Sequence, residues 1–373
     1  MFIGDIDIEK FYVGQDPVDK IYLGQDLIYT AEEPEPDYST MPLTFTITGD
    51  GYINWKASSS ANTKTIEYSK NDGDWTSITS TTEGVQIPVV SGDTVKFRGN
   101  NDQYATSTSI YNTFSGTTCG FNLKGNIMSM VNATDYANVT SLPSVSYIFC
   151  RLFMLCNTLT DASNLILPAT TLADDCYYAM FQNCMSLTKA PSILPATTLK
   201  NSCYLYMFGG CTSLTQAPAL PATTLNTGCY QSMFSNCTGL TQAPELPATT
   251  LAYSCYSNMF QGCTSLTTAP ELPATTLAGS CYQSMFYGCT SLTTAPVLPA
   301  TKLAQTCYSA MFQGCTSLNY VKCLATNISA SNCTNNWVNG VASTGTFVTP
   351  SSTNWTTGVD GIPTNWTRVN SDA

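Results

Sequence analysis

Two glutamates and a set of cysteines are the residues of this chain whose types and spacing suggest chemistry. Glu245 and Glu271 occupy equivalent positions in adjacent copies of a repeat, and paired carboxylates do the acid and base work of glycosidases. Other copies carry Ser192, Ala219 and Val297 there, so a variable surface position that is acidic twice explains the pair better. The chain has no histidine, which removes Ser-His and Cys-His nucleophile systems and histidine-bound metals. We therefore expect a protein that is not an enzyme and that uses no cofactor or metal.

The cysteines recur as C-x7-C pairs, with one pair in each copy of the repeat. These pairs are Cys176/Cys184, Cys203/Cys211, Cys229/Cys237, Cys255/Cys263, Cys281/Cys289 and Cys307/Cys315. Zinc sites need closer C-x2-4-C knuckles, which this sequence lacks. Disulfides are an alternative, because strands stacked about 4.8 Å apart bring Cα atoms within bridging range. We expect buried free thiols that act as small hydrophobic side chains.

A repeat of 26 residues underlies these positions. It reads L-P-A-T-T-L-A-x-x-C-Y-x-x-M-F-x-G-C-T-S-L-T-x-A-P-x in its last full copies. The Leu-Pro step that opens each copy falls at Leu167, Leu194, Leu220, Leu246, Leu272 and Leu298. A period in this range is typical of a solenoid, in which each unit buries its apolar face against neighbouring units. Solenoids usually present a long exposed surface, which favours binding over catalysis.

Each copy is expected to combine a helix with a short extended segment. Apolar residues at every fourth position of the copy 272–297 predict a helix from about residue 278 to 288, with Gly288 as its left-handed cap. The prolines of the extended segment each remove a ladder donor, so this strand is short. Strands stack about 4.8 Å apart and helices roughly 9 Å apart. Residues 146–318 therefore predict a curved α/β solenoid of about seven coils, with its strands on the concave side.

Positions that vary between copies mark a candidate binding strip on that concave side. The strip consists of Lys189, Ser192, Gln216, Gln242, Glu245, Thr268, Glu271 and Thr294. These positions lie on or beside the extended segment, whereas the repeated Leu, Cys, Met, Phe and Pro residues serve the core. A row of merely solvated side chains is the competing interpretation.

The segments around the repeat have patterns of their own. Residues 42–128 contain seven short alternating segments, which predict a β-sandwich of immunoglobulin or fibronectin type. Asn71-Asp72-Gly73 is a hairpin signal within it. Residues 129–145 connect the sandwich to the repeat, and residues 319–373 read as the terminal cap. Trp337, Trp355 and Trp366 in this cap offer stacking surfaces for sugars, but covering the last coil is the preferred interpretation.

The amino-terminal residues 1–31 contain two short alternating runs that each end in Gly-Gln-Asp, which reads as strand and turn. Two such strands are too few for an isolated fold, so the segment either docks on another chain or folds back on its neighbour. The candidate anchor residues are Phe11, Tyr12, Ile21, Tyr22 and Leu23. Residues 32–41 form an acidic linker that contains proline.

Charge narrows the classes of partner. Charged residues make up only 10% of the chain, a composition common in proteins that work outside cells. The net charge is −11 and no basic patch exists, which argues against nucleic acid. No apolar run is long enough for membrane insertion, and the first residues lack the pattern of a secretory signal. We expect the protein to leave its cell without a leader, as virion proteins do on lysis.

Two segments of the chain resemble known families. The recurring Phe-x-x-Cys-x-x-Leu with its extended run to Leu-Pro resembles the BspA-type leucine-rich repeats of bacterial surface proteins, over about 170 residues. The segment Lys-Ile-Tyr-Leu-Gly-Gln-Asp-Leu-Ile-Tyr resembles the short leader of virion proteins from tailed phages of gut bacteria. The first resemblance implies adhesion to host proteins or glycans, and the second implies attachment to a capsid or tail.

Together these features predict a multidomain protein: an N-terminal β-sandwich followed by a curved α/β leucine-rich-repeat solenoid with a C-terminal cap. The predicted function is that of a virion structural protein, which residues 1–31 anchor to capsid or tail proteins. It would be oligomeric on the particle and would bind a host surface protein or glycan through its repeats. A bacterial cell-surface adhesin is the alternative.

Overall fold

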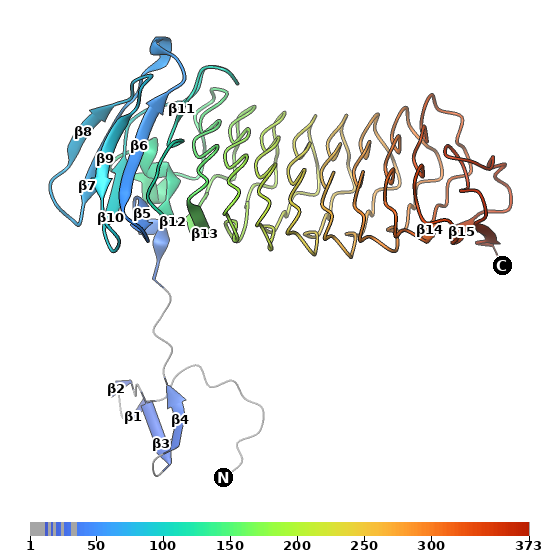
Figure 1. The fold of residues 1–373 in the computed structure, drawn as a ribbon, viewed down its shortest axis with the longest axis horizontal. Coiled ribbons are helices and arrows are strands. Elements are labelled where there is room, and N and C mark those ends of the chain that lie inside the picture. The colour runs from blue at the N-terminus through green and yellow to red at the C-terminus, as the bar shows by residue number, and fades with distance from the viewer. Residues whose placement is uncertain (1–11, 14–15, 18–19, 24–25, 31–35, 373) are drawn as a thin grey trace. The chain divides into compact units, whose positions relative to one another are not determined.

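The structure of the protein is a computed structural model, which describes residues 12–13, 16–17, 20–23, 26–30 and 36–372. It forms two compact units, Met1–Asp37 and Tyr38–Ala373. In the first unit, β1 pairs with β2 and β3 pairs with β4, both antiparallel (Figure 1). These strands are β1 Tyr12–Val13, β2 Asp16–Pro17, β3 Lys20–Leu23 and β4 Asp26–Thr30.

The second unit begins with two sheets that share an apolar core. The larger has the strand order β13-β12-β5-β10-β7-β8, and the smaller has the order β11-β6-β9. The larger sheet contains β5 Leu43–Ile47, β7 Thr65–Lys70, β8 Thr76–Thr79, β10 Thr94–Arg98, β12 Phe121–Asn126 and β13 Leu159–Ile166. The smaller contains β6 Gly51–Ala57, β9 Val85–Val89 and β11 Asn112–Thr113. Short 3-10 helices are η1 Tyr38–Thr40, η2 Ser60–Asn62, η3 Ile127–Met130 and η4 Tyr136–Asn138.

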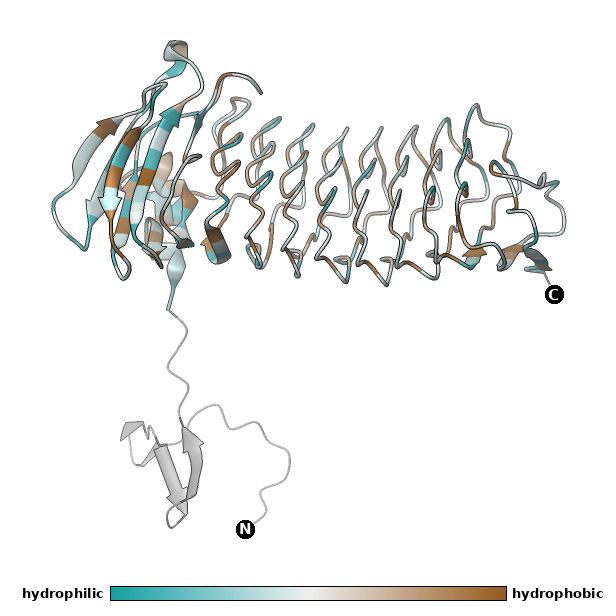
Figure 2. Cartoon of the chain, in the orientation of Figure 1, coloured by the Kyte–Doolittle hydropathy of each residue, from teal (hydrophilic) through white to brown (hydrophobic). Residues whose placement is uncertain are grey.

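Aromatic side chains from both sheets meet in this core. Phe114 lies 5.0 Å from Phe45 and from Phe97 of the larger sheet, and 4.8 Å from Trp55 of the smaller, between ring centroids. Apolar residues alternate with polar ones along these strands (Figure 2), because successive side chains of a strand point to opposite faces. The seven segments with this alternation in the sequence are all strands in the structure.

The strand order differs from the expected immunoglobulin or fibronectin type. In an immunoglobulin domain the first strand belongs to the same sheet as the second. Here β5 lies between β10 and β12 and is antiparallel to both, while β6 belongs to the other sheet. The connection between β7 and β8 begins with the signalled turn, since Asn71 and Asp72 have φ values of 51° and 58° and the N–H of Gly73 donates to the Lys70 carbonyl at 3.0 Å.

The repeats do not form the expected α/β leucine-rich-repeat solenoid. The protein is 24% strand and 4% helix, and no helix of the described residues reaches seven residues. Of residues 278–288, which were expected to be helical, 279–288 form consecutive turns. Accordingly, none of the described helices is long and apolar enough to cross a membrane.

A turn ribbon with a period of four residues replaces each expected helix. Ser280, Ser284 and Gly288 have left-handed φ values of 54°, 54° and 72°. The N–H of Met285 donates to the carbonyl of Tyr282, three residues earlier, at 3.2 Å. N–H groups alternate along the ribbon: that of Gln283 also donates three residues back, to Ser280, whereas that of Ser284 donates to Ser309 of the next coil at 2.8 Å. An α-helix needs right-handed residues and continuous bonds to the fourth preceding residue, so apolar residues at every fourth position marked a different structure here.

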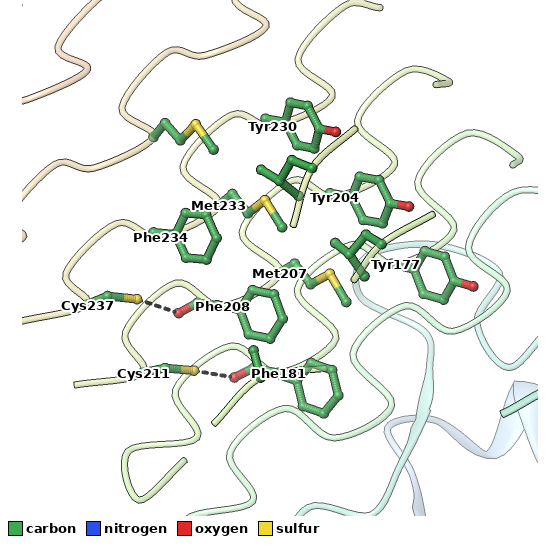
Figure 3. Packing of buried hydrophobic residues seen from close by; sticks show 14 of the residues in the cluster. Tyr177, Phe181, Tyr204, Met207, Phe208, Cys211, Tyr230, Met233, Phe234 and Cys237 are labelled. Atoms are coloured by element: carbon green, nitrogen blue, oxygen red, sulfur yellow. Dashed lines mark hydrogen bonds between the residues drawn. The ribbon is translucent and has the colours of Figure 1, made fainter. Parts of the chain in front are cut away.

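The apolar residues of the ribbons form columns through successive coils (Figure 3). Tyr204 and Tyr230 stack with ring centroids 5.7 Å apart, and Phe208 and Phe234 also stack at 5.7 Å. The expected curvature depended on helices that stack farther apart than strands. Because ribbons replace the helices, that mismatch is absent and there is no basis for a concave strand face. The coils follow one another in a single row (Figure 1).

Both ends of the columns are covered. At the first end, Phe114 stacks on Phe153 at 5.6 Å, and β12 pairs in parallel with β13 of the first coil. At the other end, Trp337 lies 6.2 Å from Tyr308 and 6.3 Å from Phe312. The coil pattern extends beyond residue 318, because the N–H of Phe312 donates to the Trp337 carbonyl at 2.8 Å. A parallel sheet completes the chain with β14 Tyr320–Lys322, β15 Thr346–Thr349 and β16 Thr367–Asn370.

Candidate binding surface

The residues of the candidate strip lie in two exposed rows that cross neighbouring coils. The first row contains Lys189, Gln216, Gln242, Thr268 and Thr294. Parallel bridges join Lys189 to Gln216 and Gln242 to Thr268. The second row contains Ser192, Ala219, Glu245, Glu271 and Val297, which are all exposed as well. The repeat therefore aligns the variable positions, although on a row of coils and not on the concave face of a horseshoe.

An ion pair holds the beginning of the first row. The ammonium group of Lys189 lies 3.2 Å from a carboxylate oxygen of Asp161 on β13. Burial acts to raise the pKa of Asp161, but hydrogen bonds from the hydroxyl and N–H of Ser163, at 2.6 and 2.8 Å, together with Lys189, keep that pKa below its ordinary value. Asp161 is thus charged and partnered, and this end of the strip offers no free carboxylate.

The backbone ladder between coils is closed at both ends of the second row. Near the start, the N–H of Ala219 donates to the Ser192 carbonyl at 2.9 Å, and the N–H of Leu194 donates to the Ala219 carbonyl at 3.1 Å. Near the end, the N–H of Leu298 donates to the Lys322 carbonyl at 3.0 Å. Each of these contacts saturates backbone groups that would otherwise face solvent.

The middle of the second row lacks these bonds. Among residues 36–372, no hydrogen bond or bridge joins the backbone of Glu245 or Glu271 to a neighbouring coil. We call residues 244–247, 270–273 and 296–299 the open segment; its last stretch is open only towards residues 270–273, because Leu298 is bonded to the coil on its other side. Each of its three stretches reads Pro-x-Leu-Pro, so two of every four residues have no N–H to donate.

Two adjoining grooves lie along the open segment. One has a volume of about 460 Å³ and is lined by residues 243–247 together with Pro270, Glu271 and Pro273. The other has a volume of about 330 Å³ and lies between residues 269–273 and the Pro296, Val297 and Pro299 side chains. Both volumes fall in the range of small-ligand pockets. The grooves share Glu271, so together they make one surface across three coils.

The two glutamates of the open segment are exposed carboxylates without a cationic partner. Within the described part of the chain, no lysine or arginine nitrogen lies within 4.0 Å of either carboxylate. The acid of a glycosidase is typically a carboxyl group held in a buried, apolar setting. Glu245 and Glu271 lie in exposed positions, an arrangement better suited to binding a cation than to donating a proton to a sugar.

All seventeen cysteines are buried free thiols, which confirms the expectation for the pairs of the repeat. The second thiol of each pair donates to the phenylalanine carbonyl of the preceding coil, as Cys211 does to Phe181 at 3.0 Å and Cys237 to Phe208 at 3.1 Å (Figure 3). Burial raises the pKa of Cys211 to about 12, so this thiol is protonated. No cluster of His, Cys, Asp or Glu within residues 36–372 has the makings of a metal site.

The tryptophans of the terminal segment are used for capping. Trp337, Trp355 and Trp366 are buried, and Trp355 stacks on Trp337 at 5.3 Å. Their indole N–H groups donate to Gly361, Thr349 and Ala342, at 2.9, 2.9 and 2.8 Å. Their ring faces are therefore unavailable for stacking on sugars.

The sequence patterns did not predict a polar pocket on the outer face of the larger sheet. Its volume is about 460 Å³, and Trp75, Lys96, Arg98 and Tyr136 are among its lining residues. The Arg98 guanidinium lies 4.0 Å above the Trp75 ring and 2.7 Å from the Glu67 carboxylate. Both cations of the pocket are already paired, since Lys96 contacts Asp72. Only the side-by-side placement of β7 and β10 would have revealed this pocket.

The candidate anchor lies partly outside the described residues, which exclude Phe11. Tyr12 lies in β1, and Ile21, Tyr22 and Leu23 lie in β3. Strand β3 pairs with β4 in antiparallel register, with Ile21 opposite Tyr29. These described residues are extended, as expected, whereas the Gly-Gln steps of the expected turns lie outside the described residues.

Both resemblances stay predictions, and the left-handed turn ribbons contradict the leucine-rich-repeat architecture that one of them implied. Comparison of the chain with protein-family models, curated proteins and solved structures gave no match.

Proposed function

We propose that the protein is a non-enzymatic structural component of a phage particle, which its amino-terminal unit anchors to capsid or tail proteins. Its stacked coils present an adhesive surface to a host protein or glycan. The observation that carries this proposal is the division into a small unit, Met1–Asp37, and one large unit that displays the exposed rows of the strip.

The large unit has the properties of a rigid display. Its coils are tied by stacked tyrosine and phenylalanine columns and by backbone bonds from coil to coil. Both ends of the columns are covered, so the stack does not expose its core. Side chains on the two rows vary from coil to coil while the columns stay constant, which is the division of labour expected of a repeat that binds through its surface.

The small unit suits docking better than independent function. Its described strands form only two-stranded sheets, and such hairpins are marginal in water unless they pack against something else. A contact with a virion protein would supply that support. We expect several copies of the chain to be held together on the particle through this unit.

Deletion of residues 1–31 tests the proposal. Particles from cells that express the full chain or the truncated chain are purified and analysed by mass spectrometry. We expect the full chain in the particles and the truncated chain only in the soluble fraction, folded as judged by its circular dichroism. Normal incorporation of the truncated chain would refute the anchor. Recovery of the full chain on the surface of the producing cells, and not in particles, would favour a bacterial adhesin.

A further inference from the structure

We propose that the open segment binds an extended peptide that carries lysine or arginine side chains. This inference rests on the proposed adhesive function and specifies the chemistry of its ligand. Three observations support it: unsatisfied backbone groups, a preformed floor of proline rings, and two carboxylates that lack a cation.

The missing coil-to-coil bonds leave backbone donors and acceptors available at the surface. The N–H groups of Glu245 and Glu271 donate to no neighbouring coil, and their carbonyls accept from none. An extended peptide offers the complementary N–H and C=O groups at regular intervals, as in other cases where a strand adds to an open edge. A ligand that satisfies these groups gains bonds that the closed ends of the row make internally.

The sequence explains why the ladder is open only here. Two coils before the open segment, residues 190–195 contain one additional residue, in Ala-Pro-Ser-Ile-Leu-Pro, and residues 320–324 after it read Tyr-Val-Lys-Cys-Leu without proline. These two departures coincide with the places where the ladder is closed. Between them, Pro-x-Leu-Pro faces Pro-x-Leu-Pro, and neither side supplies a regular set of donors. The opening is therefore a built feature of the central coils.

The proline rings make the groove rigid and partly apolar. Pro244, Pro270 and Pro296 repeat along one side, and Pro247, Pro273 and Pro299 repeat along the other. Proline fixes its own backbone angle, so little conformational freedom is lost when a ligand binds. Methylene stems of lysine or arginine pack on such a surface while their charged ends stay hydrated.

Charge selects the ligand. Glu245 and Glu271 lie on adjacent coils and line the same groove, without a cation within ion-pair distance in the described structure. Like charges on neighbouring coils repel each other, and a cationic side chain between them removes that repulsion. Ala219 and Val297 stand at this position on the flanking coils, so the charge is confined to two coils. The favoured partner is thus a short basic segment, and a neutral glycan would leave both carboxylates unpaired.

Fluorescence anisotropy with the full chain tests this site. The probe is a fluorescein-labelled peptide of about ten alternating lysine and serine residues, a length that spans the three coils of the open segment. We expect binding at low ionic strength that weakens with added salt. The double variant Glu245→Gln/Glu271→Gln should bind roughly tenfold more weakly, and Val297→Glu, which adds a third carboxylate, should bind more tightly.

A matched control separates the groove from general attraction to an acidic protein. The variant Glu83→Gln/Asp102→Asn removes the same charge from exposed positions on the sandwich, and it should bind like the unmodified chain. Equal weakening by both double variants would overturn the proposal. So would salt-independent binding of maltotriose that depends on Glu245 and Glu271, because it would mark a glycan site. Unchanged thermal unfolding of the variants confirms that they fold.

Failure of this inference is distinguishable from failure of the proposed function. Particles are assembled with the Glu245→Gln/Glu271→Gln chain and analysed as for the truncation. The variant should be incorporated normally, because the groove lies in the large unit and the anchor in the small one. Normal incorporation with unchanged peptide binding would overturn the groove alone, whereas a full chain absent from the particles would overturn the virion role.

Discussion

Ala310 allows a direct test of the turn ribbon that replaces the expected helix. Its φ is 53°, in the left-handed region, and its side chain is half-buried. An L-residue in this region costs roughly 1–2 kcal/mol, and glycine avoids that cost but loses about 0.5–1 kcal/mol of extra backbone entropy on folding. We therefore expect Ala310→Gly to raise the free energy of unfolding by about 0.5–1 kcal/mol. In a helix the same substitution would lower it by about 1 kcal/mol.

Two further variants control this comparison. Ala304 is also half-buried but does not have a positive φ, so Ala304→Gly should lower the free energy of unfolding. Gly314 has a φ of 76°, and a Cβ added there would lie 3.6 Å from Gly288 Cα, an ordinary contact. Gly314→Ala should therefore destabilise the protein by about 1–2 kcal/mol through backbone strain alone.

Urea unfolding followed by tryptophan fluorescence measures these effects. Trp337 and Trp355 lie buried against the last coils, so their emission reports loss of the stack. Because repeat proteins can unfold in stages, the midpoints of the same transition are compared among the variants. Equal destabilisation by Ala310→Gly and Ala304→Gly would refute the left-handed assignment, since only a right-handed backbone treats the two sites alike.

Two predictions concern the columns inside the coils. The buried hydroxyl of Tyr256 has no hydrogen-bond partner, so Tyr256→Phe should raise the free energy of unfolding by about 1 kcal/mol. The control Tyr104→Phe loses a 2.6 Å bond to the Met130 carbonyl and should lower it in the same urea assay. Burial raises the pKa of the Cys211 and Cys263 thiols from 9.0 to about 12, so the stability that they contribute is present below pH 9 and declines as the pH rises towards 12. Alkylation followed by mass spectrometry should find both thiols unreactive in the folded protein at pH 8; labelling there would contradict their burial.

Local patterns predicted the elements of the sandwich but not how they pair. Alternation marked all seven strands, and Asn71-Asp72-Gly73 marked the turn between β7 and β8, because both signals depend on neighbouring residues. The place of β5 between β10 and β12 depends on contacts between residues about fifty and eighty positions apart, as in the pairing of Thr44 with Lys96 and with Lys124. A local sequence pattern does not indicate which distant strands will pair.

The repeat shows where periodicity itself is ambiguous. Over the ten residues of a ribbon, positions four apart match a helix with 3.6 residues per turn almost as well as a structure with four. The second signal was present: Ser280, Ser284 and Gly288 also stand four apart, and serine and glycine are poor interior residues of a helix. A helix would distribute them around its circumference by about 40° per step, whereas the ribbon gives all three the same left-handed conformation.

Only part of the open segment could be predicted from the sequence. The variable positions of the strip, including Glu245 and Glu271, follow from aligning the copies. The central coils lack backbone hydrogen bonds to one another, and the prolines alone do not predict this. Pro218 and Pro296 stand in coils that do have such bonds to one of their two neighbours. The bonds are missing where one Pro-x-Leu-Pro stretch lies beside another, and this depends on how the coils are ordered in the stack.

Residues inside the columns and residues on the surface rows differ in how far a change disturbs the stack. A residue in a column contacts its equivalents on both sides, as Phe234 does with Phe208 and Phe260, so a change there disturbs three coils at once. A residue on the second row contacts solvent, and where the ladder is open even its backbone is released from the neighbouring coils. Changes at Glu245 and Glu271 therefore alter what the surface binds at little cost to the stack. For this reason we expect recognition to be encoded in the central coils, whose surface is the part of the repeat least constrained by its own architecture.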